Sequence, residues 1–426
     1  MSTSDQARVV QAPIVIVGAG IVGLCSAAYL QQDGRNVTLI DAGGPGEGST
    51  FGNAGCLNAS SVVPVSMPGT IKQVPGWLMD PLGPLAIRWS YLPSFLPWLL
   101  RFWRAGTEAN VQKQAQALRP LLVDSLANYL PLAKEAGVDR LIHHIGHLVA
   151  YSTEEGYRKD EAAMRLRADN GSAITTLSGD ALHELEPDLG AQFTKGRIIR
   201  ENGHCSNPLA LAQGLARLIE TRGGTILREK VTSFETSGGE VTAVATDRGR
   251  HAASHVVLAA GAWSKQLARQ LGDDVPLDTE RGYHIMIRDA ESGPRIPTTW
   301  AEGKTVSTPM ETGLRFAGTV EFAGIDAPPN WERANMQLRL GQKMYPQLAA
   351  NYSEERLTRW MGFRPSMPDS LPVIGPASRY RNAFHAFGHG HVGLCAGSTT
   401  GRVVADLIGG RKPSVPIEAF SAKRFA

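Results

Sequence analysis

Three glycines near the start of the sequence are the first residues whose spacing indicates chemistry. In Gly18-Ala-Gly20-Ile-Val-Gly23, the first glycine permits a tight turn, the second lets a pyrophosphate approach the backbone, and the third lets a helix pack closely on a strand. Asp41 follows 18 residues after Gly23, where a carboxylate can accept hydrogen bonds from both hydroxyls of a ribose. The pattern predicts a dinucleotide site, with a glycine turn in an unrelated α/β protein as the alternative.

The residues after Asp41 indicate which dinucleotide is bound. A doubly wound nicotinamide enzyme would continue with further βαβ units, whereas residues 43–58 form a loop rich in small residues. Such a loop exposes backbone amides that suit a second phosphate and a flat ring, as an extended FAD requires. A disordered linker is the alternative interpretation of this loop.

The elements that must position these residues begin with a βαβ unit. Residues 13–18 are a β-branched run that predicts a buried parallel strand, residues 21–33 a helix, and residues 36–41 a second strand. The same patterns predict further elements toward the other end of the chain. They are a helix at 208–222, a strand at 224–234, short hairpin strands through 247, a strand at 255–261, a turn-rich loop at 362–376, a strand at 383–387, a glycine loop, and a helix at 398–409.

The middle of the chain has a different pattern. Helical periodicity covers 107–136 and 154–170 with a strand at 147–151 between them, and residues 276–360 alternate like an antiparallel sheet with a helix at 332–348. The predicted fold class is α/β (α+β overall). It has a discontinuous Rossmann-like FAD-binding domain and a second, substrate-binding domain on a mainly antiparallel sheet. The predicted boundaries are 1–60, 200–275 and 365–426 for the first domain, and 61–199 and 276–364 for the second.

Composition excludes several classes of protein. The 43 Lys and Arg residues nearly balance 40 Asp and Glu residues, so a dedicated nucleic-acid binder is not expected. The four cysteines lie far apart without a CxxC pair, which disfavours a disulfide framework and a zinc ribbon. Residues 1–12 show no secretory signal, and charges and prolines interrupt the most apolar stretch, so no membrane span is predicted.

Glycine is in excess, and its surplus lies at the two ends of the chain. Of 46 glycines, ten fall in residues 1–60 and nine in residues 362–410. Both groups lie in loops predicted to approach a cofactor, which requires backbone without side chains. Two histidine groups, at 143, 144 and 147 and at 385, 389 and 391, have spacings that could ligate zinc. No HExxH motif or cysteine pair accompanies them, so no metal is predicted.

Taken together, six blocks resemble a known family. They are the glycine fingerprint at 18–23, the loop Ser49–Gly55, Val256-Val-Leu-Ala-Ala-Gly-Ala-Trp263, Arg281-Gly-Tyr283, Gly362–Asp369 with Pro372–Gly375, and Gly388-His-Gly-His-Val-Gly393. In order and spacing the chain resembles the FAD-dependent D-amino acid dehydrogenases, within the wider D-amino acid oxidase, glycine oxidase and sarcosine oxidase superfamily. The blocks are specific for the superfamily and less specific for the substrate.

The resemblance implies a set of substrate-binding residues. Arg364 matches the arginine that grips the substrate carboxylate, which a guanidinium does with two hydrogen bonds, and Pro365 restrains its backbone. Tyr283 matches a tyrosine that adds a hydroxyl to the same carboxylate. Gly390 would offer its carbonyl to the amine, and His389 would orient substrate or flavin. A surface ion pair, a packed strand tyrosine and a purely local histidine are the respective alternatives for the three side chains.

The resemblance also implies how FAD is held. Gly362 stands where sarcosine oxidases carry a flavin-linking cysteine, so non-covalent FAD is expected. The helix after Gly393 would aim its N-terminus at the flavin and stabilise the reduced anion. The residues expected to bind the cofactor are Gly18, Ala19, Gly20, Ile21, Val22, Gly23, Asp41, Ala42, Ser49, Thr50, Asn53, Ala54, Gly55, Val231, Ala260, Gly261, Gly390, His391, Val392 and Gly393.

The expected reaction is the oxidative deamination of a D-amino acid, a step of amino acid catabolism. Hydride passes from the α-carbon to FAD N5, and the imine is hydrolysed to a 2-oxo acid and ammonia, with no side chain needed as acid, base or nucleophile. A secondary or cyclic substrate of the D-hydroxyproline, D-proline, sarcosine or glycine type is the closest alternative. A flavin-bearing subunit of an electron-transfer complex and a nicotinamide dehydrogenase are more distant ones.

A tryptophan-rich segment bears on the electron acceptor. Residues 77–103 contain Trp77, Trp89, Trp98 and Trp103 together with several arginines. Such a segment suits a membrane interface where reduced flavin passes electrons to quinone, or to an electron-transfer protein. An internal packing cluster or a cover for the active site is an equal alternative. The expected location is cytoplasmic, with possible peripheral contact on the cytoplasmic face of the inner membrane.

Overall fold

A six-stranded sheet brings distant parts of the chain together in the computed structural model, which describes residues 12–426 apart from the side chains of Gln73 and Trp77. Its order is β10-β2-β1-β14-β22-β21, and the first five strands are parallel. The strands are β1 (Ile14–Val17), β2 (Val37–Asp41), β10 (Thr225–Arg228), β14 (His255–Leu258), β21 (Val373–Pro376) and β22 (Ala383–Phe387). The expectation about a secretory signal concerns residues 1–12, of which 1–11 lie outside the described range.

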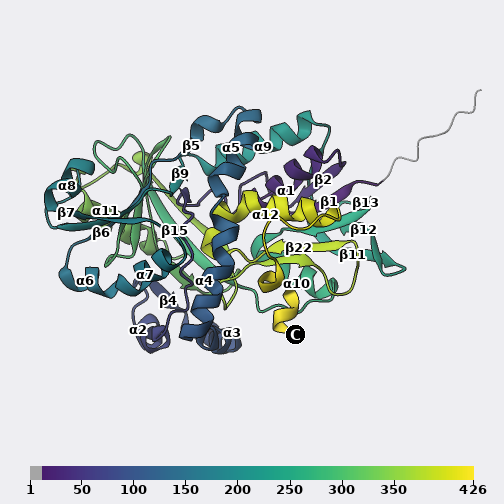
Figure 1. Ribbon diagram of the computed structural model, residues 1–426, viewed down its shortest axis with the longest axis horizontal. Coiled ribbons are helices and arrows are strands. Elements are labelled where there is room, and N and C mark those ends of the chain that lie inside the picture. Colours follow the sequence, from purple (N-terminus) through teal and green to yellow (C-terminus); the bar gives the residue numbers. More distant parts are fainter. Residues whose placement is uncertain (1–11) are drawn as a thin grey trace, which may run out of the picture.

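Two helices from opposite ends of the sequence pack on this sheet side by side. They are α1 (Ile21–Gln32) and α12 (Gly393–Ile408), and both are small-residue helices with long buried faces (Figure 1). A Cβ at Gly401 would lie 2.5 Å from the backbone carbonyl carbon of Cys25, so the absence of a side chain lets the two backbones approach. The close contact fixes the start of α12 beside the start of α1.

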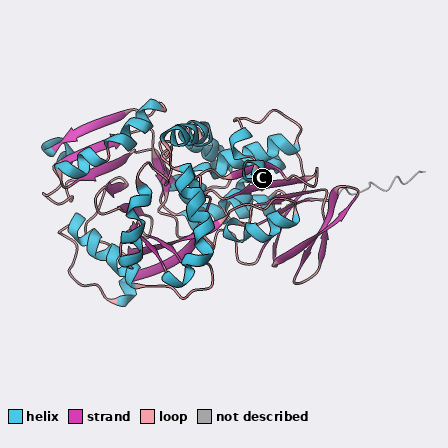
Figure 2. Ribbon diagram, turned by 90° about the horizontal axis from the view of Figure 1, so that it is seen from below, coloured by secondary structure: helices cyan, strands magenta, loops and turns pink. Residues whose placement is uncertain are grey.

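A ten-stranded sheet forms the other half of the molecule. Its order is β4-β19-β15-β18-β17-β16-β6-β8-β7, with β20 paired antiparallel to β15. Figure 2 shows these strands apart from those of the parallel sheet, with helices packed around both. The strands are β4 (Leu85–Ile87), β6 (His147–Tyr151), β7 (Ile174–Ser178), β8 (Lys195–Ile199), β15 (Asp278–Ile287), β16 (Thr298–Trp300), β17 (Thr305–Met310), β18 (Gly313–Ala317), β19 (Val320–Phe322) and β20 (Leu357–Ser366).

Two small sheets and the remaining helices complete the fold. The sheet β11-β12-β13 projects at one end of the molecule, and β3-β9-β5 pairs short segments from distant parts of the chain (Figure 1). The strands are β3 (Cys56–Leu57), β5 (Ile142–His143), β9 (Gly203–Cys205), β11 (Val231–Ser237), β12 (Glu240–Thr246) and β13 (Arg250–Ala252). The helices are α2 (Val74–Met79), α3 (Leu92–Ala105), α4 (Glu108–Leu122), α5 (Ser125–Glu135), α6 (Glu154–Lys159), α7 (Glu161–Asp169), α8 (Gly179–Leu185), α9 (Pro208–Thr221), α10 (Ser264–Gln270) and α11 (Glu332–Met344).

The structure confirms the fold class and corrects several element boundaries. The helix predicted at 107–136 is two helices, because the chain leaves helical geometry at Asp124, and the helix predicted at 154–170 is divided at Asp160. The strand predicted at 224–234 is β10 in the parallel sheet followed by β11 in another sheet. The turn-rich loop predicted at 362–376 is in part strand, since β20 continues to Ser366 and β21 begins at Val373. In each case the sequence has one continuous local pattern, and sheet pairing or a turn divides that segment into two elements.

The largest boundary error concerns α12, which begins at Gly393 and not at 398. The glycines at 393 and 397 lowered the local helix propensity and led to the wrong prediction. Tertiary packing reverses this preference, because a Cβ at Gly397 would lie 2.7 Å from the hydroxyl of Tyr129. The parallel sheet draws strands from 14–41, 225–258 and 373–387, and the ten-stranded sheet from 85–199 and 278–366. The exact division into two domains stays a prediction.

Candidate active site

The carboxyl ends of the parallel strands open on one cavity. Gly18 follows β1, Asp41 ends β2, Glu229 follows β10, Ala259 follows β14, and the segment from His389 follows β22, and each borders the cavity. Ligands of open α/β sheets bind outside the carboxyl ends of their strands, where loops and helix N-termini are free. The two glycine-rich ends of the sequence therefore meet at this cavity.

The cavity has a volume of about 1270 Å³ and a second wall from the ten-stranded sheet. The loop after β2 runs along its side. Of the predicted substrate and cofactor residues, those that border the cavity are Gly18, Gly20, Ile21, Val22, Asp41, Ala42, Ser49, Thr50, Asn53, Ala54, Val231, Ala260, Gly261, Arg364, His389, Gly390, His391 and Gly393.

The backbone around Gly18 fits a pyrophosphate. Gly18 has φ +111, and a Cβ there would lie 2.4 Å from the carbonyl oxygen of Ala259, so only glycine is accommodated. A Cβ at Gly23 would lie 2.0 Å from the carbonyl oxygen of Gly18, which explains the close helix–strand packing. The helices α1 and α12 both start at the cavity without a side-chain N-cap. Their positive dipole ends suit anionic groups.

Asp41 and Thr50 shape the rim of this nucleotide region. The Asp41 carboxylate accepts hydrogen bonds from the backbone amides of Ala19 (2.6 Å) and Gly43 (2.8 Å). Each carboxylate oxygen keeps a further lone pair for a hydroxyl donor. The Thr50 hydroxyl accepts from the amide of Ile21 at 3.1 Å, which ties the loop to the start of α1. The region thus has the donors and acceptors that a dinucleotide requires.

The C-terminal glycine segment forms the opposite border of the cavity. Gly390 has φ +52 and no atom within 4 Å of the position of a Cβ, so its backbone faces open space. His389 is buried, and its Nε2 lies 3.0 Å from the Thr400 hydroxyl. Burial lowers the pKa of His389 to about 3, and burial with the charges of Arg364 and Arg167 lowers the pKa of His391 to about 4. Both imidazoles are therefore neutral at pH 7.

Arg364 stands on β20 where the strand passes the cavity. Its Nη1 donates to the carbonyl oxygen of Thr319 at 3.1 Å, and its guanidinium lies over Gly282, where a Cβ would be 2.5 Å from Cζ. The nearby carboxyl of Glu280 accepts from the Ser366 hydroxyl at 2.5 Å. Burial lowers the pKa of Arg364, and Glu280 opposes that shift. No ion pair joins Arg364 to a carboxylate among residues 12–426, so it can receive an anionic ligand.

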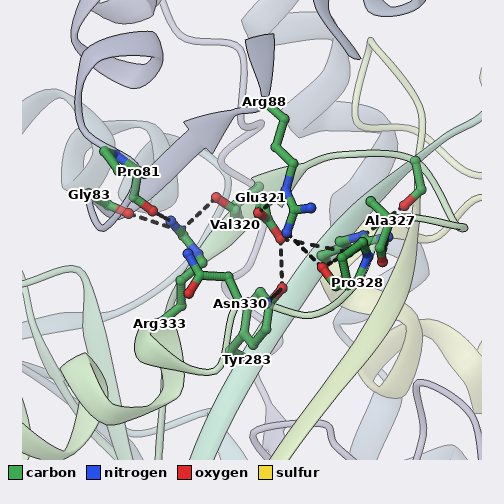
Figure 3. A network of polar contacts seen from close by, with 12 residues as sticks. Pro81, Gly83, Arg88, Tyr283, Val320, Glu321, Ala327, Pro328, Asn330 and Arg333 are labelled. Atoms are coloured by element: carbon green, nitrogen blue, oxygen red, sulfur yellow. Dashed lines mark hydrogen bonds and ion pairs between the residues drawn. The ribbon is translucent and has the colours of Figure 1, made fainter. Parts of the chain in front are cut away.

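The predicted substrate contact of Tyr283 is wrong in this structure. Along β15, Gly282 and His284 face the cavity side, so Tyr283 points to the other face of the sheet. Its hydroxyl donates to Glu321 at 2.6 Å and accepts from the amide of Asn330 at 3.0 Å. Figure 3 shows this buried network, in which Arg88 donates to Glu321 at 2.7 Å and Arg333 to backbone carbonyls. The network ties β4 and the 324–330 loop to the sheet.

Four of the predicted cofactor residues do not border the cavity but support its wall. Ala19 is buried behind Asp41, and Val392 is packed in the core under α12. Gly23 contacts Gly18 as described above. Gly55, with φ +79, accepts a hydrogen bond from the amide of Cys205 at 2.7 Å and so joins the loop to β9. Their predicted contact with the cofactor stays a prediction.

The structure adds cavity residues that sequence reasoning missed. Asn58, His147, Arg167, Thr299, Lys304 and Trp360 all border the cavity. Trp360 stacks on His284 with ring centroids 5.2 Å apart and covers Gly52 and Gly362. Arg315 is buried and donates to the backbone of Phe51 and Asn53. Two of these residues carried a local signal: Asn58 ends the glycine-rich loop 43–58, and His147 belongs to a histidine group in the sequence.

The histidines of the two possible zinc groups lie in separate environments. His143 stacks on His204, His147 borders the cavity, and His385 pairs with Asp273 at 2.8 Å. Within the described residues, no three His, Cys, Asp or Glu side chains gather in a way that could hold a metal ion. The same residues contain no helix of the length and apolarity needed to cross a bilayer.

A cysteine at position 362 would not fit this site. A Cβ on Gly362 would lie 2.0 Å from a ring carbon of Trp360. Cys56 and Cys395 also border the cavity, but burial raises their pKa values to about 12 and about 11. Both thiols are therefore protonated at neutral pH and poorly nucleophilic. Non-covalent attachment of the cofactor stays a prediction that these contacts favour.

Comparisons with known proteins agree with this geometry. The sequence matches the DAO family, described as FAD dependent oxidoreductase, over residues 13–407. A D-amino-acid oxidase of Bradyrhizobium diazoefficiens is 45% identical over 415 residues, which cover 97% of this chain and 98% of the relative. A D-amino acid dehydrogenase of Paramagnetospirillum magneticum is 30% identical over 421 residues, with 97% and 98% covered.

A comparison with solved structures finds the same fold. A glycine oxidase from Geobacillus kaustophilus aligns with a TM-score of 0.73 at 22% identity, covering 97% of this chain and 98% of the other. The family match spans both sheets and every segment that borders the cavity. The chain therefore belongs to the DAO family of FAD-dependent oxidoreductases.

Proposed function

We propose that this enzyme oxidatively deaminates D-amino acids. The observation that carries the proposal is Arg364, a cavity guanidinium without an acidic partner among the described residues, close to the carboxyl edge of the nucleotide-binding sheet. The 45% identical relative is named a D-amino-acid oxidase, and others are named D-amino acid dehydrogenases, which supports this substrate class. The bound flavin supplies the chemistry, because it accepts a hydride from the substrate α-carbon.

The residues of the chain contribute binding and orientation. Gly18, Gly20 and the start of α1 would hold the pyrophosphate of FAD, and Asp41 would bind its ribose. The segment 390–393 and the start of α12 would hold the flavin ring. Arg364 binds the substrate carboxylate through two hydrogen bonds, and the Gly390 carbonyl accepts from the amine. The neutral imidazoles of His389 and His391 add no positive charge beside the amine. Orientation of the substrate relative to the ring would contribute to the acceleration.

Anaerobic reduction of the flavin tests the proposed function. The purified holoenzyme is mixed without oxygen with a panel of D-amino acids, their L-enantiomers, and N-methyl or cyclic amino acids. We expect several D-amino acids to bleach the flavin absorbance and their L-enantiomers to leave it unchanged. Bleaching only by sarcosine- or proline-type compounds would instead assign the closest alternative function. Bleaching by none of the panel would refute oxidative deamination.

We also propose that electrons leave the enzyme at a membrane surface, by transfer to quinone. The helix α3 buries Phe95, Trp98 and Phe102 but exposes Leu96, Leu100 and Trp103, and Trp103 is 55% exposed. Trp89 and Met79 are exposed nearby, at 64% and 79%. Arg101 and Arg104 are exposed on the same helix and suit anionic headgroups. The contact would lie on the cytoplasmic face of the inner membrane.

Vesicle binding and acceptor assays test this proposal. We expect the holoenzyme to sediment with vesicles that contain anionic phospholipid, and Leu100→Ser with Trp103→Ser to weaken binding on the order of tenfold. Trp331→Ser, which alters an exposed tryptophan outside α3, is the matched control. Reduction of a quinone analogue is compared with oxygen consumption and with reduction of electron-transfer proteins. Vesicle binding that is equal in all variants would refute the assignment of α3.

A further inference from the structure

Arg167 is a second cavity guanidinium that forms no ion pair with any described carboxylate. It projects from α7 and borders the same cavity as Arg364. Its side chain has a weak contact with the sulfur of Met164 at 3.9 Å, and no ion pair joins it to any residue in the described part of the chain. Burial lowers the pKa of Arg167, which indicates that its surroundings compensate the charge incompletely. A guanidinium in this condition is a receptor for an anion.

The acidic residues near Arg167 have other partners. Asp160, at the start of α7, also borders the cavity, but its carboxylate accepts a hydrogen bond from the Tyr151 hydroxyl at 2.6 Å. The next residue, Glu161, forms an ion pair with Arg197. Asp160 is near enough to favour the charged form of Arg167 without forming an ion pair with it. The guanidinium therefore keeps its donors for a ligand in the cavity.

A hydroxyl donor stands in the same part of the cavity. Nε2 of His147 lies 2.8 Å from the Thr299 hydroxyl, and Nδ1 lies 3.2 Å from the side-chain nitrogen of Asn58. In the tautomer that carries its proton on Nε2, the His147 ring donates to the Thr299 hydroxyl. The Thr299 hydroxyl then has its own proton free for an acceptor in the cavity. Burial, followed by the Arg167 charge, lowers the pKa of His147 to about 3, so the ring stays neutral.

Arg167 and Arg364 border the same cavity and place two positive charges there. Both border the cavity, and both guanidinium charges act on the His391 imidazole, which lies in the segment that begins α12. The exposed amine of Lys304 adds a further positive charge to the cavity wall. A substrate held at its α-carboxylate by Arg364 thus meets a second positive site within the same cavity.

We propose that Arg167 and Thr299 bind the side-chain carboxylate of an acidic D-amino acid. This inference rests on the proposed function and specifies its substrate class as D-aspartate- or D-glutamate-type compounds. Arg167 donates from its guanidinium and Thr299 from its hydroxyl, while Arg364 holds the α-carboxylate. A neutral isostere such as D-glutamine presents an amide nitrogen that cannot accept these hydrogen bonds, and it lacks the charge that Arg167 requires.

Paired substrates of equal size test the inference. Anaerobic stopped-flow reduction of the holoenzyme is measured with D-glutamate against D-glutamine, D-aspartate against D-asparagine, and D-alanine as the substrate without a polar side chain. We expect the better acidic substrate to exceed its amide by about 10- to 100-fold in reduction rate over Kd, as for charge-assisted hydrogen bonds. In Arg167→Met this ratio should fall to near 1, whereas Arg165→Met, which alters an exposed arginine of α7, should retain it.

Binding without turnover supplies a second readout. Glutarate, which has two carboxylates and no amine, should raise the melting temperature of the wild-type holoenzyme more than butyrate does, and this difference should disappear in Arg167→Met. Equal rates for acids and amides in the wild type, or an equal loss for D-alanine and D-glutamate in Arg167→Met, would overturn the inference while the proposed function stands. If no D-amino acid reduces the flavin, the proposed function fails, and this assignment fails with it.

Discussion

Replacing Arg364 by alanine should weaken substrate binding strongly and leave the cofactor in place. A guanidinium has five N–H donors, and Arg364 uses one on the Thr319 carbonyl, which leaves enough for both oxygens of a carboxylate. Two charge-assisted hydrogen bonds each contribute about 1.5 to 3 kcal/mol, partly replaced by water in the variant. A net loss of about 3 to 4 kcal/mol corresponds to a rise in Kd of about 10²- to 10³-fold.

Rapid-reaction kinetics can isolate this effect from changes in the cofactor. Flavin reduction by D-alanine is followed without oxygen over a range of concentrations, and FAD content is measured from the absorbance of each variant. Arg364→Lys keeps the charge but not the two-point geometry, so we expect a loss between those of the wild type and Arg364→Ala. Arg359→Ala is the matched control, because Arg359 stands on the same strand and pairs with Glu354 outside the cavity.

A substrate without a carboxylate completes the test. D-alaninol has a hydroxymethyl group in place of the carboxylate, so Arg364→Ala should change its Kd far less than that of D-alanine. An unchanged Kd for D-alanine in an FAD-loaded Arg364→Ala variant would refute the clamp. An equal rise in Kd for D-alanine and D-alaninol would also refute it, since a damaged site would then explain the loss.

Three further predictions follow from other parts of the structure. Gly18→Ala should lose most of its FAD, because Gly18 has φ +111 and the added methyl would lie 2.4 Å from the Ala259 carbonyl oxygen. Gly34→Ala should keep its FAD, because Gly34 has φ +71 but no atom within 4 Å of the position of the added methyl. Equal ratios of FAD to protein in the two variants would contradict this prediction. Burial raises the pKa of Glu186 from 4.5 to about 7 although backbone amides donate to it, so the protonated form favours the folded state and this contribution to stability is lost as the pH rises through about 7. Between pH 5 and pH 8 the wild type should therefore lose about 2 to 3 kcal/mol of stability relative to Glu186→Gln. Melting curves of the two proteins should show a difference in melting temperature that grows with pH. Burial raises the pKa of Cys25, Cys56 and Cys205 to about 12 and that of Cys395 to about 11. The native protein should therefore react slowly with a thiol reagent at pH 8, whereas all four thiols of the denatured protein should react at once.

Local rules were enough to predict the nucleotide half of the site. The fingerprint at Gly18 works through backbone conformation and close approach, which are properties of a few consecutive residues. The strand, turn and helix that it requires lie directly beside it in the sequence. The resemblance to a family pointed to Arg364, and the structure places this residue at the cavity; its role as the carboxylate clamp stays a prediction. Glycine excess at both ends indicated that the two regions serve one cofactor, and both border one cavity.

Sheet pairing decided what local patterns left open. Tyr283 and Arg364 stand on the paired strands β15 and β20, yet Tyr283 bonds to Glu321 on the opposite face, because side chains alternate along a strand. In the sequence, the tryptophans at 77–103 form one cluster, and nothing local separates those that pack inside from those that face outward. In the fold, Trp98 packs against Phe322 of β19, while Trp103, on the same helix, faces outward. The contact with β19, which lies far away in the sequence, buries Trp98 and leaves Trp103 exposed.

The sequence by itself determined the cofactor class and the backbone turns that receive it, because these depend on residues close together in the chain. Only the tertiary structure decided which residues of the ten-stranded sheet and of α7 border the cavity. Arg167 lies on a short helix with no motif around it, and Thr299, His147 and Arg364, which border the same cavity, come from strands far apart in sequence. Their meeting depends on the order of strands in a ten-stranded sheet, which is set by packing across the whole chain.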